Sequence, residues 1–291
     1  MKIRAPAKIN LTLRVVGRRA DGYHLLDTVM VPVSLYDDID IRKVGVAKKQ
    51  SKFPRPLIKV TCSNPAVPTG PKNLAYRAAE LLLAKAKPKP PIEIRIRKRI
   101  PVGAGLGGGS TDAAATLNGL NRLLKLKLSR QKLEQLGLSL GADVPFFVRG
   151  LPARAGGIGE KLQPLRGLPA MWLVIIYPGF PVSTTWVYRN LPRKLTIPEV
   201  NNSITRRLKD FNNLQAVLVN ELEPVTLNRY PKIAIIKEKL LRAGAAACLM
   251  SGSGSSVFGI FHSNRKARVA FRKLMAEEEG AQAYLVKCLA R

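Results

Sequence analysis

The sequence predicts an α+β protein, in which strands and helices are mixed without a strict β-α-β order. Some stretches alternate apolar and polar residues, which predicts half-buried strands, and others repeat apolar residues every three or four positions, which predicts amphipathic helices. The 291 residues are 46% hydrophobic, enough for two domains with substantial cores. A break near residues 156–167 predicts an N-terminal domain of residues 1–160 and a C-terminal domain of residues 161–291.

In the first half of the chain, alternation predicts the strands, and capping residues predict where helices begin. Asn73 is a candidate N-cap for a helix that runs to Lys85, and Ser129 for one that runs to about Leu140. A further helix is expected over residues 113–124. Strands are expected at residues 8–15, 29–33, 38–42 and 92–97, with a turn at Asp21 and Gly22 and an exposed basic loop at residues 44–56.

The second half continues in the same mixed pattern. Strands are expected at residues 171–176, 246–250, 257–261 and 284–288. Helices are expected at residues 213–221, 232–243 and 265–279.

The composition excludes several classes of protein. There is no apolar run near the roughly 18 residues that span a bilayer, and no signal peptide is expected at the N-terminus. The three cysteines are far apart and form no C-x-x-C pair, so neither a disulfide framework nor a zinc site is expected. We expect a cytoplasmic enzyme or binding protein.

The chain is strongly basic, with 49 Lys and Arg against 19 Asp and Glu and a net charge of +30. Such a charge attracts polyanions and predicts weak, non-specific nucleic-acid binding. The basic residues are spread along the chain, with one concentration at residues 43–59, and no nucleic-acid-binding motif accompanies them. A basic, solvated surface is therefore favoured over a dedicated nucleic-acid function.

A glycine run at residues 103–109 is the strongest functional signal. It lies between a predicted strand and a predicted helix and is followed by Ser110 and Thr111. Glycines let backbone N–H groups approach a bulky anion, and the helix N-terminus adds partial positive charge. The run predicts a phosphate site, and a nucleotide as its ligand. A ligand-free connection is less favoured, because so many glycines cost much backbone entropy.

Three better-known phosphate motifs do not fit this run. A dinucleotide fingerprint expects an acid about 20 residues later, yet no Asp or Glu lies between Asp112 and Glu134. A P-loop needs Lys directly before Ser or Thr, where this chain has Gly109. The H-R-D and D-F-G signatures of protein kinases are absent from the sequence.

Three segments together resemble the motifs of one enzyme superfamily. They are residues 6–11 (PAKINL), 101–111 (PVGAGLGGGST) and 251–256 (SGSGSS). In this order and spacing they resemble the galactokinase, homoserine kinase, mevalonate kinase and phosphomevalonate kinase (GHMP) superfamily. Residues 21–24 (DGYH) and 141–147 (GADVPFF) are similar to those of its members that act on a cytidyl diphosphate-linked methylerythritol. The resemblance covers nearly the whole chain.

The resemblance implies the two-domain GHMP kinase fold with the active site in the interdomain cleft. It implies ATP-dependent phosphorylation of the 2-hydroxyl of the methylerythritol moiety, in the non-mevalonate route to isoprenoids, with ATP as donor and Mg²⁺ expected. A sibling kinase that acts on homoserine or a mevalonate derivative is one alternative. A basic nucleic-acid-binding protein on a related scaffold is the other.

The resemblance also implies roles for single residues. Asp143 would be the base, taking the hydroxyl proton late because a carboxylate is a weak base, although an N-cap is its alternative role. Lys8 would orient the hydroxyl and offset charge in the transition state. The ATP phosphates would be bound by Pro101, Val102, Gly103, Ala104, Gly105, Leu106, Gly107, Gly108, Gly109, Ser110 and Thr111. Ser110 or Thr111 would touch a phosphate or Mg²⁺, or else serve only as a helix cap.

The remaining implied residues bind the two nucleotides. Asn73 is a candidate for the adenine side, with helix capping as an equal alternative. Tyr23 and His24 suit a cytosine ring by stacking and hydrogen bonding. Asn10 shares a strand face with Lys8 and would bind the substrate hydroxyls or the catalytic Asp. The other candidates for the substrate are Thr184, Tyr188, Gly252, Ser253 and Gly254.

Overall fold

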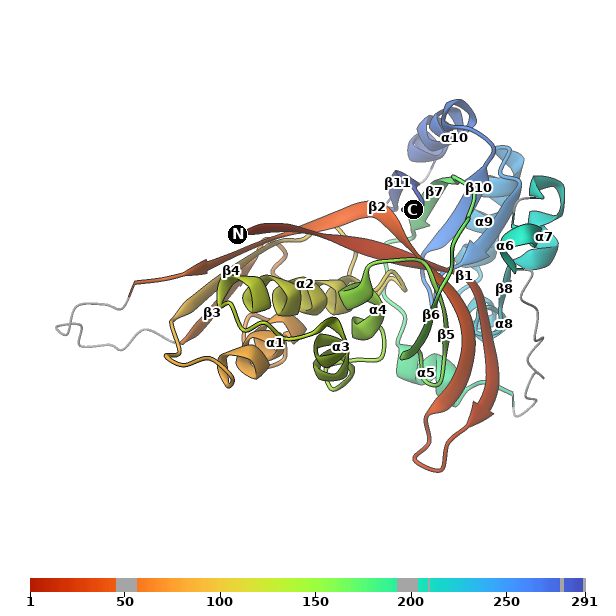
Figure 1. The fold of residues 1–291 in the computed structure, drawn as a ribbon. Helices are drawn as coiled ribbons and strands as arrows, with labels where there is room; N and C mark the ends of the chain where they lie inside the picture. Colours follow the sequence, from red (N-terminus) through yellow and green to blue (C-terminus); the bar gives the residue numbers. More distant parts are fainter. Residues whose placement is uncertain (46–56, 193–203, 209, 278–279, 290–291) are drawn as a thin grey trace. The chain divides into compact units, whose positions relative to one another are not determined.

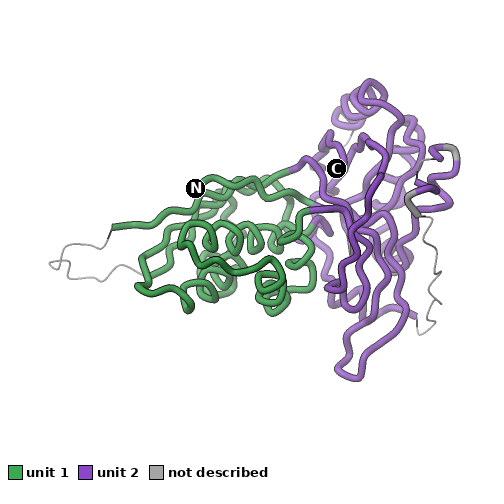
Figure 2. The backbone as a smooth tube through the Cα atoms, viewed as in Figure 1, with its two compact units in different colours: residues 1–7, 36–102, 107–150 green, residues 8–35, 103–106, 151–291 purple. Residues whose placement is uncertain are grey.

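The computed structural model describes residues 1–45, 57–192, 204–208, 210–277 and 280–289, which form two compact units (Figures 1 and 2). Unit 1 comprises residues 1–7, 36–102 and 107–150, and unit 2 comprises residues 8–35, 103–106 and 151–291. Each unit contains strands and helices, which confirms the predicted α+β class. Two long strands, β1 (Lys2–Arg18) and β2 (His24–Lys43), contribute residues to both units.

Each of the two units is assembled from several separate segments of the chain, because the units are defined by contacts between residues. The division into residues 1–160 and 161–291 therefore stays a prediction, as does an active site in a cleft between two domains. The expected basic loop at residues 44–56 lies mostly outside the described residues. No helix in the described part of the chain is long and apolar enough to cross a bilayer.

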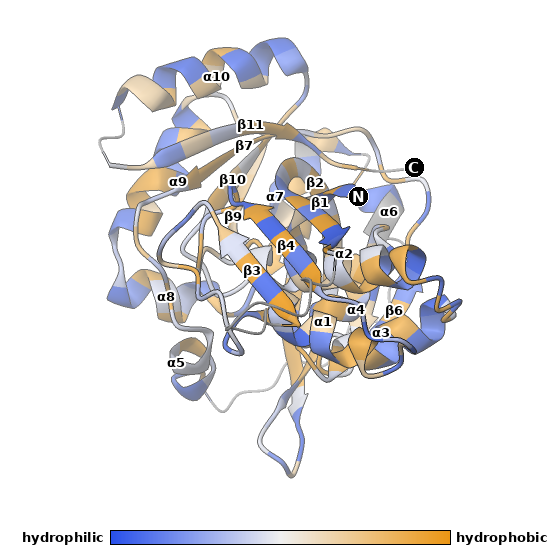
Figure 3. Ribbon diagram, turned by 90° about the vertical axis from the view of Figure 1, so that its left-hand side faces the viewer, coloured by the Kyte–Doolittle hydropathy of each residue, from blue (hydrophilic) through white to orange (hydrophobic). Residues whose placement is uncertain are grey.

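In its described residues, unit 1 combines β3 (Ile58–Cys62), β4 (Ile92–Arg97) and parts of β1 and β2 with four helices. β3 pairs in parallel with β4, and β4 pairs antiparallel with the end of β2. The alternation of β4 appears as stripes in Figure 3, with Ile94 and Ile96 buried and the arginines exposed. The helices are α1 (Leu74–Leu83), α2 (Gly108–Leu123), α3 (Arg130–Leu138) and α4 (Val144–Arg149).

Helix α2 lies directly on the strands of unit 1. A β-carbon at Gly119 would lie 2.5 Å from Ile3 Cδ1 and 2.7 Å from Ile41 Cδ1, so a larger residue there would displace the ends of these two side chains. On its other side α2 packs against α1. The buried alanines and leucines of both helices make this contact tight.

Unit 2 is built on a four-stranded antiparallel sheet in the order β11-β7-β10-β9. The strands are β7 (Trp172–Tyr177), β9 (Ala247–Met250), β10 (Val257–Phe261) and β11 (Gln282–Lys287). Helices α9 (Lys232–Arg242) and α10 (Asn264–Glu277) bury apolar faces on this sheet, as the two-coloured helices of Figure 3 show. Val174, Ile236, Phe261 and Leu274 belong to the resulting core.

Shorter elements complete unit 2. β5 (Ala153–Gly156) pairs with β2 and with β6 (Lys161–Pro164), and β8 (Val219–Asn220) pairs in parallel with β1. The helices are α5 (Thr184–Arg189), α6 (Ile204–Arg207), η1 (Phe211–Asn213), α7 (Leu214–Val217) and α8 (Glu223–Arg229).

Most predicted elements are present, and three of them differ from the prediction in where they begin or end. The strands expected at residues 29–33 and 38–42 form one continuous strand, β2. The helix expected over residues 113–124 begins at Gly108. The helix expected over residues 213–221 ends at Val217, because Val219 pairs with Thr12 of β1 and this sheet pairing overrides helix propensity. The sequence patterns missed β3, β5, β6, α4, α5, α6 and α8.

Candidate functional site

The second half of the glycine run is the first turn of α2. Gly107 is the N-cap, in the left-handed conformation with φ 74°, and it has no side chain to cap the helix. Neither Ser110 nor Thr111 is therefore the N-cap, and the interpretation of either as only a cap was wrong. The first N–H groups of an α-helix have no partner within the helix, and Gly109 is exposed beside them. The helix start therefore offers backbone donors to an anion.

The first half of the glycine run belongs to unit 2, where it contacts the other two small-residue motifs. The carbonyl of Leu106 accepts a hydrogen bond from Lys8 N–H at 3.0 Å, and that of Gly105 accepts one from Ser251 Oγ at 3.0 Å. The carbonyl of Ala104 accepts from Ser256 N–H at 3.2 Å. Three segments far apart in the sequence thus meet at residues 104–106.

The contact between residue 105 and the 251–256 loop requires glycine. The φ of Gly105 is +75°, and a β-carbon there would lie 2.0 Å from the carbonyl oxygen of Ser251. Only glycine combines this backbone conformation with this approach.

Lys8 is buried in unit 2, with 4% of its surface exposed. Its ammonium donates to Asn10 Oδ1 at 2.6 Å, which confirms that the two residues share a face of β1. A β-carbon at Gly252 would lie 3.3 Å from Lys8 Nζ, so the ammonium lies against the 251–256 loop. Lys8 is therefore not a solvated surface residue, since a lysine this deeply buried needs a specific partner.

The 251–256 loop is held by residues that the sequence patterns missed. Asn220 Nδ2 donates to the carbonyls of Met250 and Gly252, each at 2.8 Å. Thr226 Oγ1 donates to the carbonyl of Ser253 at 3.2 Å. Both side chains are buried. No sequence motif marks them, because their partners lie about 30 residues away along the chain.

Two of the predicted aromatic residues contact each other in unit 2. The rings of His24 and Tyr188 stack, with centroids 5.0 Å apart and planes 25° apart. Thr184, one turn before Tyr188 on α5, forms a 2.8 Å hydrogen bond with Ser253 of the third loop. Tyr23 is 60% exposed. The predicted substrate residues of α5 and of the third loop therefore lie in one neighbourhood.

The charge of His24 follows from its surroundings. Burial, and then the charge of Arg18, lower the pKa of His24 from its ordinary value of 6.5. The imidazole is therefore neutral at physiological pH. A neutral imidazole both donates and accepts a hydrogen bond, as recognition of a nucleobase edge requires.

Asp143 belongs to unit 1 and lies directly before α4. It occupies the N-cap position with helical backbone angles, and its side chain makes no capping hydrogen bond in the described part of the chain. The N-cap explanation of this carboxylate is therefore not supported. A β-carbon at Gly141 would lie 3.9 Å from Ser110 Oγ, so the segment that carries Asp143 runs beside the start of α2.

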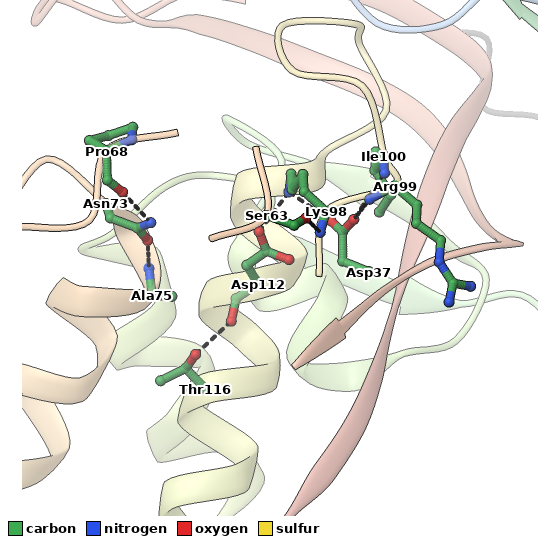
Figure 4. A network of polar contacts seen from close by, with 10 residues as sticks. All are labelled: Asp37, Ser63, Pro68, Asn73, Ala75, Lys98, Arg99, Ile100, Asp112 and Thr116. Atoms are coloured by element: carbon green, nitrogen blue, oxygen red, sulfur yellow. Dashed lines mark hydrogen bonds and ion pairs between the residues drawn. The ribbon is translucent and has the colours of Figure 1, made fainter. Parts of the chain in front are cut away.

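Asn73 is the N-cap of α1. Its Oδ1 accepts from Ala75 N–H at 2.8 Å and its Nδ2 donates to the carbonyl of Pro68 at 2.7 Å (Figure 4). The capping interpretation is confirmed, while a role on the adenine side stays a prediction. A β-carbon at Gly109 would lie 3.7 Å from Leu74 Cδ1, so α1 and α2 begin side by side.

A buried ion cluster lies beneath the start of α2 (Figure 4). Lys98 Nζ lies 2.7 Å from Asp37 Oδ2 and 2.6 Å from Asp112 Oδ2. A β-carbon at Gly108 would lie 3.0 Å from Lys98 Nζ, which places the ammonium next to the first residue of α2. Sequence patterns did not assign a role to these three residues, which come from β2, the segment directly after β4, and α2.

The ion cluster contains two carboxylates and one ammonium. Burial raises the pKa of Asp112 to about 8, because Lys98 only partly offsets burial and Asp37 adds repulsion. Burial acts to lower the pKa of Lys98, but the two carboxylates outweigh it and raise that pKa. The lysine therefore stays charged.

Among the described residues, no group of three or more His, Cys, Asp or Glu side chains is placed to hold a metal ion.

Comparison with known proteins places this geometry among kinases. Residues 73–151 match the family described as GHMP kinases N terminal domain, and residues 198–279 match GHMP kinases C terminal. The chain is 49% identical over 270 residues to a 4-diphosphocytidyl-2-C-methyl-D-erythritol kinase of Citrifermentans bemidjiense, covering 93% of this chain and 92% of that relative. It is 48% identical over 274 residues to the same-named protein of Geobacter metallireducens, covering 94% of each.

Solved structures agree. A crystal structure of 4-(cytidine 5'-diphospho)-2C-methyl-D-erythritol kinase is 36% identical, with a TM-score of 0.83 over 99% of both chains. The crystal structure of L. major mevalonate kinase in complex with R-mevalonate shares the fold, with a TM-score of 0.73 at 15% identity, covering 100% of this chain and 97% of that one.

Proposed function

The chain belongs to the GHMP kinase family and, within it, to the 4-diphosphocytidyl-2-C-methyl-D-erythritol kinases, and we propose that it transfers the γ-phosphoryl group of ATP to the 2-hydroxyl of 4-diphosphocytidyl-2-C-methyl-D-erythritol. One observation carries the proposal from this structure. The backbone of residues 104–106 binds both Lys8 of the first motif and the 251–256 loop of the third. The three motifs of the superfamily therefore lie together in unit 2. This arrangement suits phosphoryl transfer, which needs a charged side chain beside a loop that binds phosphate.

The donor substrate is MgATP, bound by residues 101–111. The first N–H groups of α2 and the helix dipole favour binding of an anion at the start of the helix. The glycines allow the phosphates of ATP to approach the backbone there. Mg²⁺ enters with the nucleotide and neutralises its phosphates. Asn73, at the adjoining start of α1, is the candidate for the adenine side.

Lys8 and Asp143 carry the chemistry in this proposal. The Lys8 ammonium, oriented by Asn10, offsets the negative charge that develops as the phosphoryl group moves. Asp143 accepts the proton of the attacking hydroxyl. Phosphoryl transfer depends mainly on positioning and charge, so a buried ammonium of fixed orientation suits the reaction.

The cytidine ring is assigned to the aromatic residues of unit 2. His24 stacks on Tyr188, and Tyr23, the residue before His24, presents an exposed ring. A ring that stacks and a neutral imidazole that hydrogen-bonds together recognise a pyrimidine base. Asn10, Thr184 and residues 252–254 are assigned to the rest of the substrate.

The surroundings of the enzyme are part of the proposal. We place it in the cytoplasm, acting on a small molecule. Weak binding of nucleic acid follows from the net charge of +30 and is expected to be independent of sequence and sensitive to salt.

The test is ADP release by the purified protein with MgATP and the cytidyl substrate, against homoserine and mevalonate as competing acceptors. Turnover confined to the cytidyl substrate is expected, and preference for another acceptor contradicts the proposal. Asp143→Asn and Lys8→Met are each expected to lower kcat by about 10²- to 10⁴-fold. Asp38→Asn, which removes a carboxylate from an exposed ion pair with Arg99, is the matched control and keeps wild-type kcat.

A further inference from the structure

A chain of buried polar groups leads from Lys8 into the sheet of unit 2. Lys8 Nζ donates to Asn10 Oδ1 at 2.6 Å, and Asn10 Nδ2 donates to Thr28 Oγ1 at 2.8 Å. Thr28 Oγ1 in turn donates to the carbonyl of Thr12 at 2.6 Å. The four residues are between 2% and 7% exposed, so water does not substitute for these partners.

The direction of each bond in this chain is determined. A backbone carbonyl can only accept, so the single hydroxyl hydrogen of Thr28 is committed to Thr12. The Thr28 oxygen can then only accept from Asn10, which turns the amide NH₂ of Asn10 toward Thr28. The amide oxygen consequently faces Lys8, where it accepts from the ammonium.

The reverse orientation of the Asn10 amide would place its NH₂ group against the ammonium. Two donors would then face each other in a buried site, and the ammonium would have to move or lose this partner. Since Lys8 Nζ lies between Asn10 and the third loop at Gly252, a displaced ammonium also shifts relative to that loop.

We infer that Thr28 is a positioning residue of the kinase, which fixes the amide of Asn10 and through it the place of the Lys8 ammonium. The inference rests on the proposed function, because it assigns the Lys8 ammonium a role in the transition state. It adds a residue of β2 that touches neither substrate.

A neighbouring threonine provides a matched comparison. Thr12 Oγ1 accepts a hydrogen bond from Val29 N–H at 3.0 Å, and Thr12 is 7% exposed against 2% for Thr28. The Thr12 hydroxyl is therefore also buried and also links β1 to β2, but it makes no bond to Asn10. A loss of fold stability alone would follow from removing either hydroxyl, whereas a loss of Lys8 positioning follows only from Thr28.

The experiment compares Thr28→Val, Thr28→Ser and Thr12→Val in steady-state kinetics, after unfolding curves establish that each variant is folded. Thr28→Val is expected to lower kcat by about 10- to 100-fold, as a small misplacement of a catalytic group does, with the KM for ATP and for the cytidyl substrate little changed. Thr28→Ser, which restores the hydroxyl, is expected to recover most of kcat. Thr12→Val is expected to keep wild-type kcat.

Three results overturn the inference while leaving the proposed function intact. They are wild-type kcat in Thr28→Val, an equal loss in Thr28→Ser, and an equal loss in Thr12→Val. If Thr28→Val does not fold, Thr28→Ala takes its place against the same controls. A wild-type protein without turnover of the cytidyl substrate overturns the proposed function itself, and the inference with it.

Discussion

Lys98 Nζ lies 2.6 Å from Asp112 Oδ2, and both side chains are 4% exposed. The same ammonium also contacts Asp37, so one cation serves two buried carboxylates (Figure 4). Asp37 is better satisfied than Asp112, because its Oδ1 accepts the backbone N–H groups of Arg99 and Ile100 at 2.6 and 2.9 Å. Asp112 Oδ1 is buried without a hydrogen-bond partner among the described residues. Asp112 is therefore the carboxyl group whose charged form is disfavoured, in line with its raised pKa of about 8.

Removal of the cation is expected to destabilise the fold strongly. Lys98→Met leaves the buried Asp37 carboxylate without its cation and should lower the free energy of unfolding by about 3–5 kcal/mol. Adding Asp37→Asn to that variant removes the unpaired buried charge and should recover part of the loss. Urea unfolding followed by circular dichroism measures both, with Lys72→Met, an exposed lysine of unit 1, as the control. A loss below about 1 kcal/mol in Lys98→Met would contradict this account.

Asp112 should also make stability depend on pH. Its pKa is about 8 in the folded protein against an ordinary 3.8, so the native state keeps a proton that the unfolded chain releases. Its contribution to the free energy of unfolding is largest below about pH 4, falls as the pH rises toward 8, and is constant above that. Unfolding of wild type and Asp112→Asn at about pH 5, 6.5 and 8 isolates this contribution. Wild type should lose stability relative to the variant as the pH rises, and a constant difference would refute the prediction.

Local patterns predicted the elements whose residues depend on near neighbours. The alternation of β4 and the caps Asn73 and Ser129 are confirmed, because each rests on contacts within a few residues. The start of α2 was predicted five residues late, since glycines disfavour helices on average. Here two of them, Gly108 and Gly109, form the first turn, and Gly108 lies close against Lys98 and Ile100.

The supporting residues of the site were not predictable in this way. Thr28, Asn220 and Lys98 are ordinary polar residues in sequence, and the groups to which their side chains donate, with the Asn10 donor of Thr28, are between 14 and 61 residues away. Only the pairing of strands brings these groups together. The glycine run, by contrast, was recognisable because glycines repeat at short spacing, whereas the roles of Lys8 and Asp143 came from the resemblance to the GHMP superfamily.

Alanine at two glycines of the run should affect different properties: the stability of the fold at Gly105 and the KM for ATP at Gly109. Gly105→Ala introduces a β-carbon 2.0 Å from the Ser251 carbonyl oxygen at a φ of +75°, and should lower the free energy of unfolding by about 2 kcal/mol or more. Gly109→Ala finds only Leu74 Cδ1 nearby, at 3.7 Å, and should leave the free energy of unfolding within about 1 kcal/mol of wild type. The added methyl group of Gly109→Ala should instead raise the KM for ATP, because it obstructs the approach of phosphate to the helix start. Thermal unfolding and ATP titration measure the two effects separately, and equal stability of the two variants would contradict the prediction.

The conformation of the 251–256 loop should depend on the two hydrogen bonds that the side-chain NH₂ group of Asn220 donates. Nδ2 donates to the carbonyls of Met250 and Gly252, while Oδ1 accepts from Leu222 N–H at 3.0 Å. Asn220→Asp keeps the size and the acceptor but turns an oxygen toward two carbonyls. The free energy of unfolding should fall by about 2–4 kcal/mol, because both buried carbonyls lose their donor.

The displaced loop should affect catalysis as well, because Gly252 lies against the Lys8 ammonium. Folded Asn220→Asp should therefore show a lower kcat. Asn118→Asp is the matched control, since the Asn118 amide makes a single long bond of 3.4 Å to the Val148 carbonyl in unit 1. Urea unfolding and initial rates should separate the two variants clearly. If Asn220→Asp matched Asn118→Asp in both measurements, the 251–256 loop would not depend on Asn220, and its other hydrogen bonds, among them those of Thr226 and Ser251, would be enough to set its conformation.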